Sequence, residues 1–248
     1  GIHQAMEADS KVLCYGLGVT DPKAVFGTTA GLEKSFGPDR VFDIPCSENA
    51  ITGIGVGAAL LGFKSIMTHQ RLDFFLLAMD QLVNSAAKWN YMFGGNTPVP
   101  ITIRLILGRG WGQGPTHSQN LQAWFAHIPG LKVVSPSSAS DAKGLLIASI
   151  FDPSPVIFLE HRWLHNSKSE VSNKSFSIEI GKANVVKLGS DITLVTSSYL
   201  VAEALDAAEY LLSAFGISSE IIDLRTIKPL DTDTILTSVK KTKRILCI

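Results

Sequence analysis

The sequence predicts an α/β protein with a doubly wound, mainly parallel sheet, followed by a second, incomplete α/β unit. Three observations support this prediction. Short apolar runs rich in β-branched residues alternate with longer helical patterns, which is typical of parallel sheets covered on both faces. The alternation starts again after a polar segment at 166–180. The 248 residues are 46% hydrophobic, enough for one large or two modest cores.

The first unit is expected to span residues 1–165. Apolar runs bounded by glycine, proline or polar residues predict its strands at 11–15, 40–45, 63–68, 100–105, 132–135 and 156–159. Apolar residues at helical spacing predict its helices at 51–62, 73–89 and 141–150. Ser140 is the expected N-cap of the last helix, because a serine oxygen accepts a hydrogen bond from a first-turn amide.

Residues 166–180 are expected to form a linker, because Ser, Asn and Lys dominate this part of the chain. A second domain then spans 181–248, with predicted strands at 191–196, 219–224 and 244–248 and predicted helices at 201–215 and 233–240. Gly216 is expected to end the first of these helices. Because an apolar strand at the end of the chain would be an unpaired edge, we expect this domain to be incomplete.

Composition excludes several classes of protein. The 22 basic and 22 acidic side chains balance, which argues against nucleic acid or an anionic membrane as the partner. No apolar run reaches the roughly 18 residues of a membrane span. The three cysteines are far apart and indicate no disulfide framework, and Cys46 is expected to be a small buried filler. His161 and His165 lack a third ligand nearby in the sequence, so no metal site is predicted there.

A lone carboxylate, Glu48, lies where the second predicted strand passes into a helix rich in glycine and alanine. Small residues let another element approach closely, so the arrangement favours a buried acid with a chemical role. The alternative is an ordinary helix start, with Ser47 as the cap and Glu48 in the first turn. Gly53, Gly55 and Gly57 lie inside the helical pattern and lack the spacing of a dinucleotide fingerprint, so they predict close helix packing.

A glycine-rich loop runs from Gly108 to Gln119, after the strand predicted at 100–105. Loops at the carboxyl ends of parallel strands commonly bind ligands. His117 in this loop is a candidate acid, base or anion-binding group, because its ordinary pKa lies near neutrality; the alternative is a structural histidine. Phe74 begins the helix after another strand, where an aromatic ring either belongs to the core or stacks on a planar ligand.

A series of short motifs occurs in a fixed order along essentially the whole chain: Val41 to Ala50, Gly57 to Gly62, Asp80-Gln81, Ala86 to Lys88, His117 to Gln119, Pro129 to Val134, Asp141 to Gly144, and Asp223 to Asp231. This series resembles the β subunit of thiamine-diphosphate-dependent 2-oxo acid dehydrogenases, of the pyruvate and branched-chain types. The resemblance implies a transketolase-like pyrimidine-binding domain followed by a transketolase-type C-terminal domain.

The resemblance also implies roles for single residues. Glu48 matches a glutamate that hydrogen-bonds a ring nitrogen of the cofactor's aminopyrimidine and favours the imino tautomer that removes the thiazolium proton. Phe74 matches the aromatic residue that packs on the pyrimidine, and Gln70 falls beside the cofactor. His117 matches a histidine that handles the substrate carboxylate or protons during acyl transfer. Some relatives hold a structural potassium ion on backbone carbonyls that match Ile101, Ser149, Asp152 and Ser154.

A Gly-Asp-Gly motif, which holds magnesium and the diphosphate in this superfamily, is absent from the sequence. The resemblance therefore implies an α subunit that carries this motif, in an α2β2 heterotetramer with the cofactor at the α–β interface. The chain alone is expected to be nearly inactive. The implied reaction is decarboxylation of a 2-oxo acid and transfer of the acyl group to a lipoyl carrier, with a lipoyl acyltransferase core as a further partner.

Other functions stay open at this stage. Relatives usually carry an acidic pair after the first strand, whereas this sequence has Leu17 and Gly18. That difference favours a specialised relative, such as the small subunit of a two-component transketolase-like or acyloin-forming enzyme. A scaffold subunit without catalytic activity is a third alternative. The expected compartment is the cytoplasm, with the mitochondrial matrix as the alternative.

Overall fold

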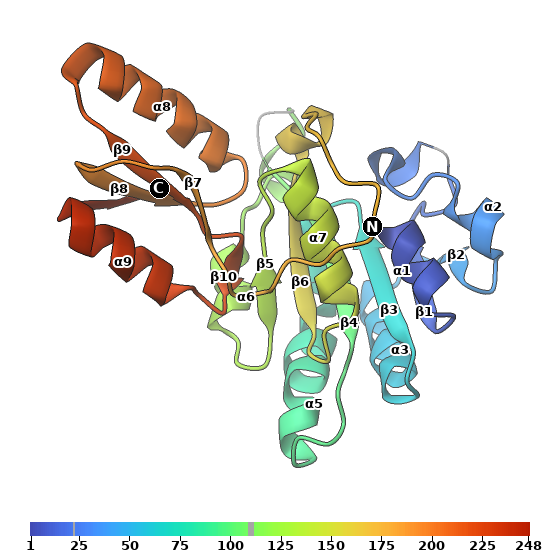
Figure 1. Cartoon of the computed structure of the whole chain (residues 1–248). Coiled ribbons are helices and arrows are strands. Elements are labelled where there is room, and N and C mark those ends of the chain that lie inside the picture. The colour runs from blue at the N-terminus through green and yellow to red at the C-terminus, as the bar shows by residue number, and fades with distance from the viewer. Residues whose placement is uncertain (22, 109–111) are drawn as a thin grey trace.

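The computed structural model describes residues 1–21, 23–108 and 112–248, arranged around two sheets (Figure 1). The first sheet has seven strands in the order β10-β5-β6-β4-β3-β1-β2. All neighbours are parallel except β10, which is antiparallel to β5. These strands are β1 (Val12–Gly16), β2 (Val41–Asp43), β3 (Lys64–His69), β4 (Ile101–Leu107), β5 (Lys132–Val134), β6 (Val156–His161) and β10 (Thr226–Lys228). The predicted α/β class with a mainly parallel sheet is confirmed.

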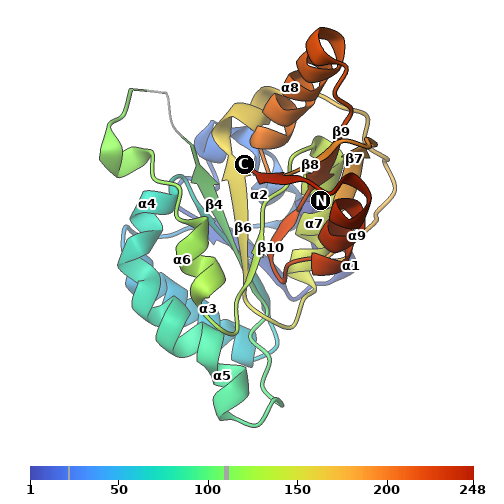
Figure 2. The same ribbon diagram turned by 90° about the vertical axis from the view of Figure 1, so that its left-hand side faces the viewer.

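Helices cover both faces of this sheet (Figure 2). One face carries α3 (Glu48–Leu60), α4 (Leu72–Phe75), α5 (Ala87–Met92) and α6 (Gln122–His127), and the other carries α1 (Ile2–Ala8) and α7 (Ala139–Ile150). The central strand β4 is buried along its whole length, because its side chains alternate between two cores. Ile103 and Leu105 pack in one core and Ile106 in the other. A short helix, α2 (Leu32–Phe36), lies beside β2.

The helix predicted for residues 73–89 is divided into several pieces. After α4 come a 3₁₀ turn (Leu76–Ala78), a π-helical segment (Gln81–Ala86) and α5. Phe75, Ala78, Leu82 and Ala86 are buried, whereas Leu77, which the helical spacing predicts on one face with Ala78 and Leu82, is 67% exposed. Apolar spacing reports which side faces the core, and it does not resolve local changes in hydrogen-bond pattern.

Two N-cap predictions differ from the structure. Ser47 occupies the N-cap position of α3, but its side chain makes no capping hydrogen bond. α7 is capped by Ser138, not by Ser140, since Ser138 Oγ accepts a hydrogen bond from the Asp141 amide at 3.1 Å. A cap bonds the amide two or three residues later, and the first turn of α7 begins at Ala139, which leaves Ser140 inside the helix.

The second sheet has the order β11-β8-β9-β7, with only β7 antiparallel to its neighbour. Its strands are β7 (Asn184–Lys187), β8 (Ile192–Thr196), β9 (Ser219–Asp223) and β11 (Ile245–Cys247). α8 (Leu200–Phe215) and α9 (Thr232–Thr242) lie on opposite sides of it (Figure 1). Gly216 ends α8 in the left-handed conformation, with φ of 68°, as predicted.

The connection between the two sheets lies against α7. Lys143 donates to the carbonyls of Ser172 and Lys174, and the Ile178 amide donates to the Gly144 carbonyl at 3.1 Å. A Cβ at Gly144 would come within 2.7 Å of the Phe176 ring, so only glycine allows this close approach. The polar composition of this segment predicts a linker, but it does not reveal these contacts with α7.

The two sheets are also joined by β10 and by a charged cluster. β10 lies within residues 181–248, yet it pairs with β5 of the first sheet. Arg225 forms an ion pair with Asp141 of α7 at 2.6 Å, and Ser137 donates a hydrogen bond to Asp223 at the end of β9. Burial, with the charge of Asp141, raises the pKa of Asp223 to about 6, against hydrogen bonds from Ser137 and the Arg225 amide.

Two further findings concern the sequence-based exclusions. In the parts of the chain that the structure describes, no helix is both long and apolar enough to cross a membrane. Cys46 is exposed, so its interpretation as a buried filler is wrong, whereas Cys14 of β1 is buried. Cys46 lies between the end of β2 and the start of α3, where the chain turns at the surface.

Candidate functional site

The predicted site residues follow three strands of the first sheet. Glu48 comes after β2, Gln70 and Phe74 come after β3, and His117 comes after β4. Because these strands are parallel, their carboxyl ends meet at the same edge of the sheet. The fold therefore places all four residues at the carboxyl ends of the strands, where ligands bind in this class of protein.

Glu48 is the first residue of α3 and is only 5% exposed. Its backbone carbonyl accepts a hydrogen bond from Thr52 Oγ1 at 2.8 Å. Within residues 1–21, 23–108 and 112–248, no donor is hydrogen-bonded to the Glu48 carboxylate. A carboxylate without such a donor, on a residue that is buried as a whole, fits a role in holding a ligand group better than a role as a plain cap.

The glycines of α3 explain how Glu48 reaches this depth. A Cβ at Gly55 would clash with the hydroxyl of Tyr15 on β1, and a Cβ at Gly53 would lie 3.3 Å from Gln81 Oε1. Tyr15 in turn stacks on Phe42 of β2, with ring centroids 5.2 Å apart. The small residues therefore let α3 lie close against the sheet, as the sequence predicts.

Phe74 and His117 contact each other. Their ring centroids are 5.3 Å apart and their planes are inclined at 86°, an edge-to-face arrangement. Both side chains are half-buried. His117 Nδ1 lies 3.1 Å from Thr116 Oγ1, so this hydroxyl fixes one side of the imidazole. No hydrogen bond or ring contact links Glu48 to either residue in the described part of the chain.

The turn after β3 holds the loop that carries His117. Asp73 Oδ1 accepts hydrogen bonds from the Gln119 amide at 3.2 Å and from Gln119 Nε2 at 2.8 Å. Arg71 donates through Nε, at 3.1 Å, and through Nη2 to Gln113 Oε1. Gln70 is exposed and donates to the Leu17 carbonyl at 3.3 Å. Arg109, Gly110 and Trp111 of the predicted loop lie outside the described residues.

The residues of the predicted potassium site are close in the fold. Ser149, Asp152 and Ser154 lie around the turn between α7 and β6, and Ile101 begins β4, the neighbour of β6. The Ser149 carbonyl accepts from the Asp152 amide at 3.2 Å, and Asp152 pairs with Lys132 at 2.5 Å. No group of three His, Cys, Asp or Glu side chains among the described residues is arranged to hold a metal ion.

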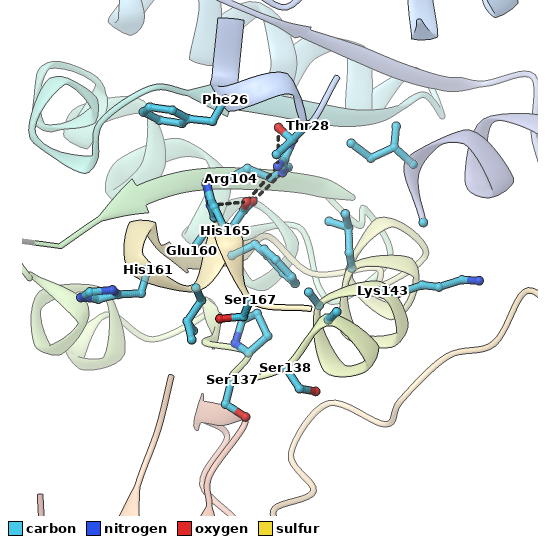
Figure 3. A pocket seen from close by; sticks show the side chains of 18 residues that line it. Phe26, Thr28, Arg104, Ser137, Ser138, Lys143, Glu160, His161, His165 and Ser167 are labelled. Carbon is cyan, nitrogen blue, oxygen red and sulfur yellow. Dashed lines mark hydrogen bonds and ion pairs between the residues drawn. The ribbon is translucent and has the colours of Figure 1, made fainter. Parts of the chain in front are cut away.

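A buried polar cluster was not predicted from the sequence. Arg104 of β4 donates from Nε and Nη2 to the two carboxylate oxygens of Glu160 on β6, at 2.6 and 2.9 Å, and from Nη2 to Thr28 (Figure 3). Burial would raise the pKa of Glu160, but Arg104 and the imidazole of His165, whose Nε2 lies 3.5 Å from Glu160 Oε2, outweigh it and lower the pKa to about 2. The sequence offered one indication of this cluster: an arginine inside a mainly apolar strand, since a buried arginine usually needs a charged partner.

Two cavities adjoin β4 and β6. One, of about 340 Å³, contains the Arg104–Glu160 pair, Phe158 and the start of α7 (Figure 3). The other, of about 290 Å³, is lined by Ser118, Leu159 and Tyr199, among others. Neither is lined by Glu48, Gln70, Phe74 or His117.

Two family models match the chain. Residues 1–167 match the transketolase pyrimidine-binding domain, and residues 181–248 match the transketolase C-terminal domain. Among solved structures, a split-gene transketolase, described as an inactive beta4 tetramer, superposes with a TM-score of 0.82 at 21% identity, over 99% of this chain and 75% of its own. A transketolase from Leishmania mexicana gives a TM-score of 0.77 at 18% identity, over 100% and 37%. At these identities the structures show a shared fold alone.

Curated relatives are considerably closer in sequence. The mitochondrial pyruvate dehydrogenase E1 component subunit beta-1 of Arabidopsis thaliana is 45% identical over 100% of this chain and 69% of its own length. The corresponding beta subunits of Rickettsia bellii and Staphylococcus epidermidis are 45% and 44% identical, over 76% and 75% of their lengths. On the strength of both domain matches and of these identities, the chain belongs to the family of β subunits of the pyruvate dehydrogenase E1 component.

Proposed function

We propose that this chain is the β subunit of a thiamine-diphosphate-dependent 2-oxo acid dehydrogenase. With an α subunit it decarboxylates a 2-oxo acid and transfers the acyl group to a lipoyl carrier. The observation that carries this proposal is Glu48, a buried residue whose carboxylate has no hydrogen-bonded donor among the described residues, at the same end of the sheet as the Phe74–His117 contact. Pyruvate is the first substrate to test, because the curated relatives are named for pyruvate dehydrogenase.

The residues at this edge fit the cofactor's aminopyrimidine ring. Glu48 would accept a hydrogen bond from a ring nitrogen, and its burial makes that bond strong, because a low local dielectric weakens screening. Phe74 would pack on the ring, with Gln70 beside it, and His117 would act on the substrate side. When bound, the cofactor supplies a nucleophilic carbon and accepts the electron pair released by decarboxylation.

The position of Glu48, Phe74 and His117 at the carboxyl ends of the strands supports a shared site that a partner completes. Two large apolar side chains are exposed on the elements that carry the site, Ile54 on α3 and Leu77 directly after α4, which favours a protein partner on this side. We propose that an α subunit supplies magnesium and diphosphate ligands in an α2β2 heterotetramer, and that a lipoyl acyltransferase core is a further partner.

The proposed potassium ion would lie on the carbonyls of Ile101, Ser149, Asp152 and Ser154. The Lys132–Asp152 pair and the hydrogen bond from the Ser154 amide to Asp152 Oδ1 at 2.9 Å hold this turn in shape. A thermal unfolding midpoint that is higher in potassium than in sodium at equal ionic strength supports the site. Equal midpoints in the two salts contradict it.

The compartment is part of the proposal too. The relatives include mitochondrial and bacterial proteins, and we propose the cytoplasm, with the mitochondrial matrix as the alternative. Fractionation of the source cells, followed by immunoblotting of each fraction, distinguishes the two.

The test is a reconstituted assay. The chain is co-expressed with its α partner, and turnover of pyruvate and of 3-methyl-2-oxobutanoate is followed with free lipoamide as acceptor. Glu48→Gln should abolish turnover, whereas Glu33→Gln, an exposed glutamate in the first turn of α2, should leave it unchanged. Full turnover in Glu48→Gln contradicts the assignment.

A transketolase-like activity is the second candidate, favoured by the fold shared with the split-gene transketolase. It would move a ketol unit between sugars and would need no lipoyl acceptor. Turnover of ketoses in the absence of lipoamide would replace the first proposal. Absence of cofactor binding with every partner would instead favour the scaffold subunit.

A further inference from the structure

The turn at residues 70–74 contacts both ends of the segment 113–119. At one end Arg71 donates two hydrogen bonds to Gln113 Oε1, and at the other end Asp73 Oδ1 accepts two from Gln119. The two charged residues are separated by only one position in the chain. The segment between these anchors includes His117, so its ends cannot shift independently of the turn.

Asp73 anchors the end of the segment that lies nearer to His117. A single carboxylate oxygen receives both a backbone and a side-chain donor from Gln119, and charge-assisted bonds of this kind are stronger than neutral ones. The second oxygen, Oδ2, is buried and has no hydrogen-bond partner in the part of the chain that the structure describes. The carboxylate is therefore directed at the loop rather than at solvent.

The anchor lies directly beside the candidate chemistry. Phe74 follows Asp73 in the chain and meets the His117 ring edge to face at 5.3 Å. Gln119 follows His117 by two residues, and Thr116 Oγ1 lies 3.1 Å from His117 Nδ1. A shift of the Gln119 end would therefore move the imidazole relative to the ring that faces the cofactor.

We propose that Asp73, through Gln119, is a positioning residue that sets the place of His117 during acyl transfer. This inference rests on the proposed function. Asp73 itself does not touch the substrate. Loss of its anchor should slow the step that uses His117 and leave cofactor binding by Glu48 and Phe74 nearly intact.

The test uses the reconstituted complex of this chain with its α partner, pyruvate as substrate and two acceptors. Free lipoamide reports acyl transfer, and an artificial one-electron oxidant reports decarboxylation. Asp73→Ala, which removes both bonds with Gln119, should lower kcat with lipoamide by about 100-fold, the cost expected of a displaced catalytic group, while KM for pyruvate changes little. Gln119→Ala keeps the backbone amide bond to Asp73 and should lower kcat by a smaller factor. The rate with the artificial oxidant should fall by less than about 3-fold.

A double-mutant cycle separates positioning from general damage. The double variant Asp73→Ala/Gln119→Ala should be no slower than Asp73→Ala, because loss of the carboxylate already removes both bonds with Gln119. Asp73→Asn, which keeps an acceptor oxygen, should recover most of the rate. Asp233→Asn, an exposed acid in the first turn of α9, is the matched control and should behave as wild type.

Three outcomes overturn the inference: wild-type acyl transfer in Asp73→Ala, equal losses with both acceptors, or additive losses in the double variant. Failure of the proposed function looks different, because the wild-type complex itself would then show no 2-oxo acid turnover with either acceptor. Thermal unfolding of each variant identifies simple misfolding. If Asp73→Ala unfolds, the acyl-transfer rates of Gln119→Ala and Asp73→Asn are compared with wild type instead.

Discussion

Phe74 and His117 come from different strand ends, yet their rings meet edge to face with centroids 5.3 Å apart. Phe74 belongs to α4, directly after β3, and His117 to the loop after β4, the neighbouring strand. The contact exists because β3 and β4 are adjacent and parallel, so the segments that follow them begin at the same end of the sheet. It joins the ring proposed to face the cofactor to the group proposed to act on the substrate.

The contact predicts separate effects for its two members. Phe74→Ala should weaken binding of thiamine diphosphate by roughly 10-fold, because an aromatic pair contributes about 0.5–1.5 kcal/mol. His117→Ala should leave cofactor binding unchanged and slow acyl transfer by about 100-fold, the usual scale of a lost acid or base. Calorimetric titration and lipoamide-dependent turnover measure the two quantities. If Phe74→Ala and His117→Ala changed cofactor binding and acyl transfer to the same extent, these separate roles would be contradicted.

The close packing of α3 predicts an effect on stability. Gly55→Ala should lower the free energy of unfolding by about 1–3 kcal/mol, because the new methyl group meets the Tyr15 hydroxyl. Tyr15→Phe should recover part of this loss, since it removes a buried hydroxyl without a hydrogen-bond partner among the described residues. Gly57→Ala is the control: nothing lies within 4 Å of its Cβ, so it should stabilise the helix by about 1 kcal/mol. Urea denaturation of the isolated chain measures all three.

The Arg104–Glu160 pair predicts sensitivity to acid. The pKa of Glu160 is lowered to about 2, so its contribution to stability is complete above the ordinary value of 4.5 and is lost as the pH falls toward 2. Glu160→Gln leaves the buried Arg104 charge uncompensated and should cost about 3–5 kcal/mol at neutral pH. Denaturation of both proteins across this range should show the difference shrinking as the pH falls. A difference that is independent of pH would contradict the assignment.

Asp223 predicts the opposite dependence on pH. Its pKa is raised to about 6, so it favours folding below its ordinary value of 3.8, and this contribution disappears as the pH rises through 6. Asp223→Asn should therefore gain stability relative to wild type between about pH 4 and about pH 7.5, by up to about 3 kcal/mol at 1.36 kcal/mol per pKa unit. Guanidinium denaturation at both pH values tests this. A constant difference would show that Asp223 does not titrate in the folded chain.

The strands and helices that the sequence predicted share strong hydrophobic patterns. β4 is buried from Ile101 to Leu107 and is apolar except at Thr102 and Arg104, and α8 has both a clear apolar face and a glycine stop. β10 and β7 were missed, because their sequences, Thr-Ile-Lys and Asn-Val-Val-Lys, contain few apolar residues and their antiparallel partners are distant in the chain. Pairing of that kind is decided by tertiary contacts rather than by local propensity.

The candidate site likewise combines residues that local sequence predicts with contacts that it does not. Glu48, Phe74 and His117 were predicted from motifs at strand ends. The bonds from Asp73 to Gln119 and from Arg71 to Gln113 were not, because each joins residues more than forty positions apart. The pairing of Arg104 with Glu160 also depends on the alignment of β4 with β6, which a single sequence does not reveal.

Calorimetric titration of thiamine diphosphate with magnesium, into this chain, into its α partner and into the two together, tests the central claim most directly. The account predicts saturable binding only when both chains are present, and strongly reduced binding when Glu48 is replaced by Gln. Tight binding to this chain alone, or equal binding by the wild-type and Glu48→Gln complexes, would contradict it.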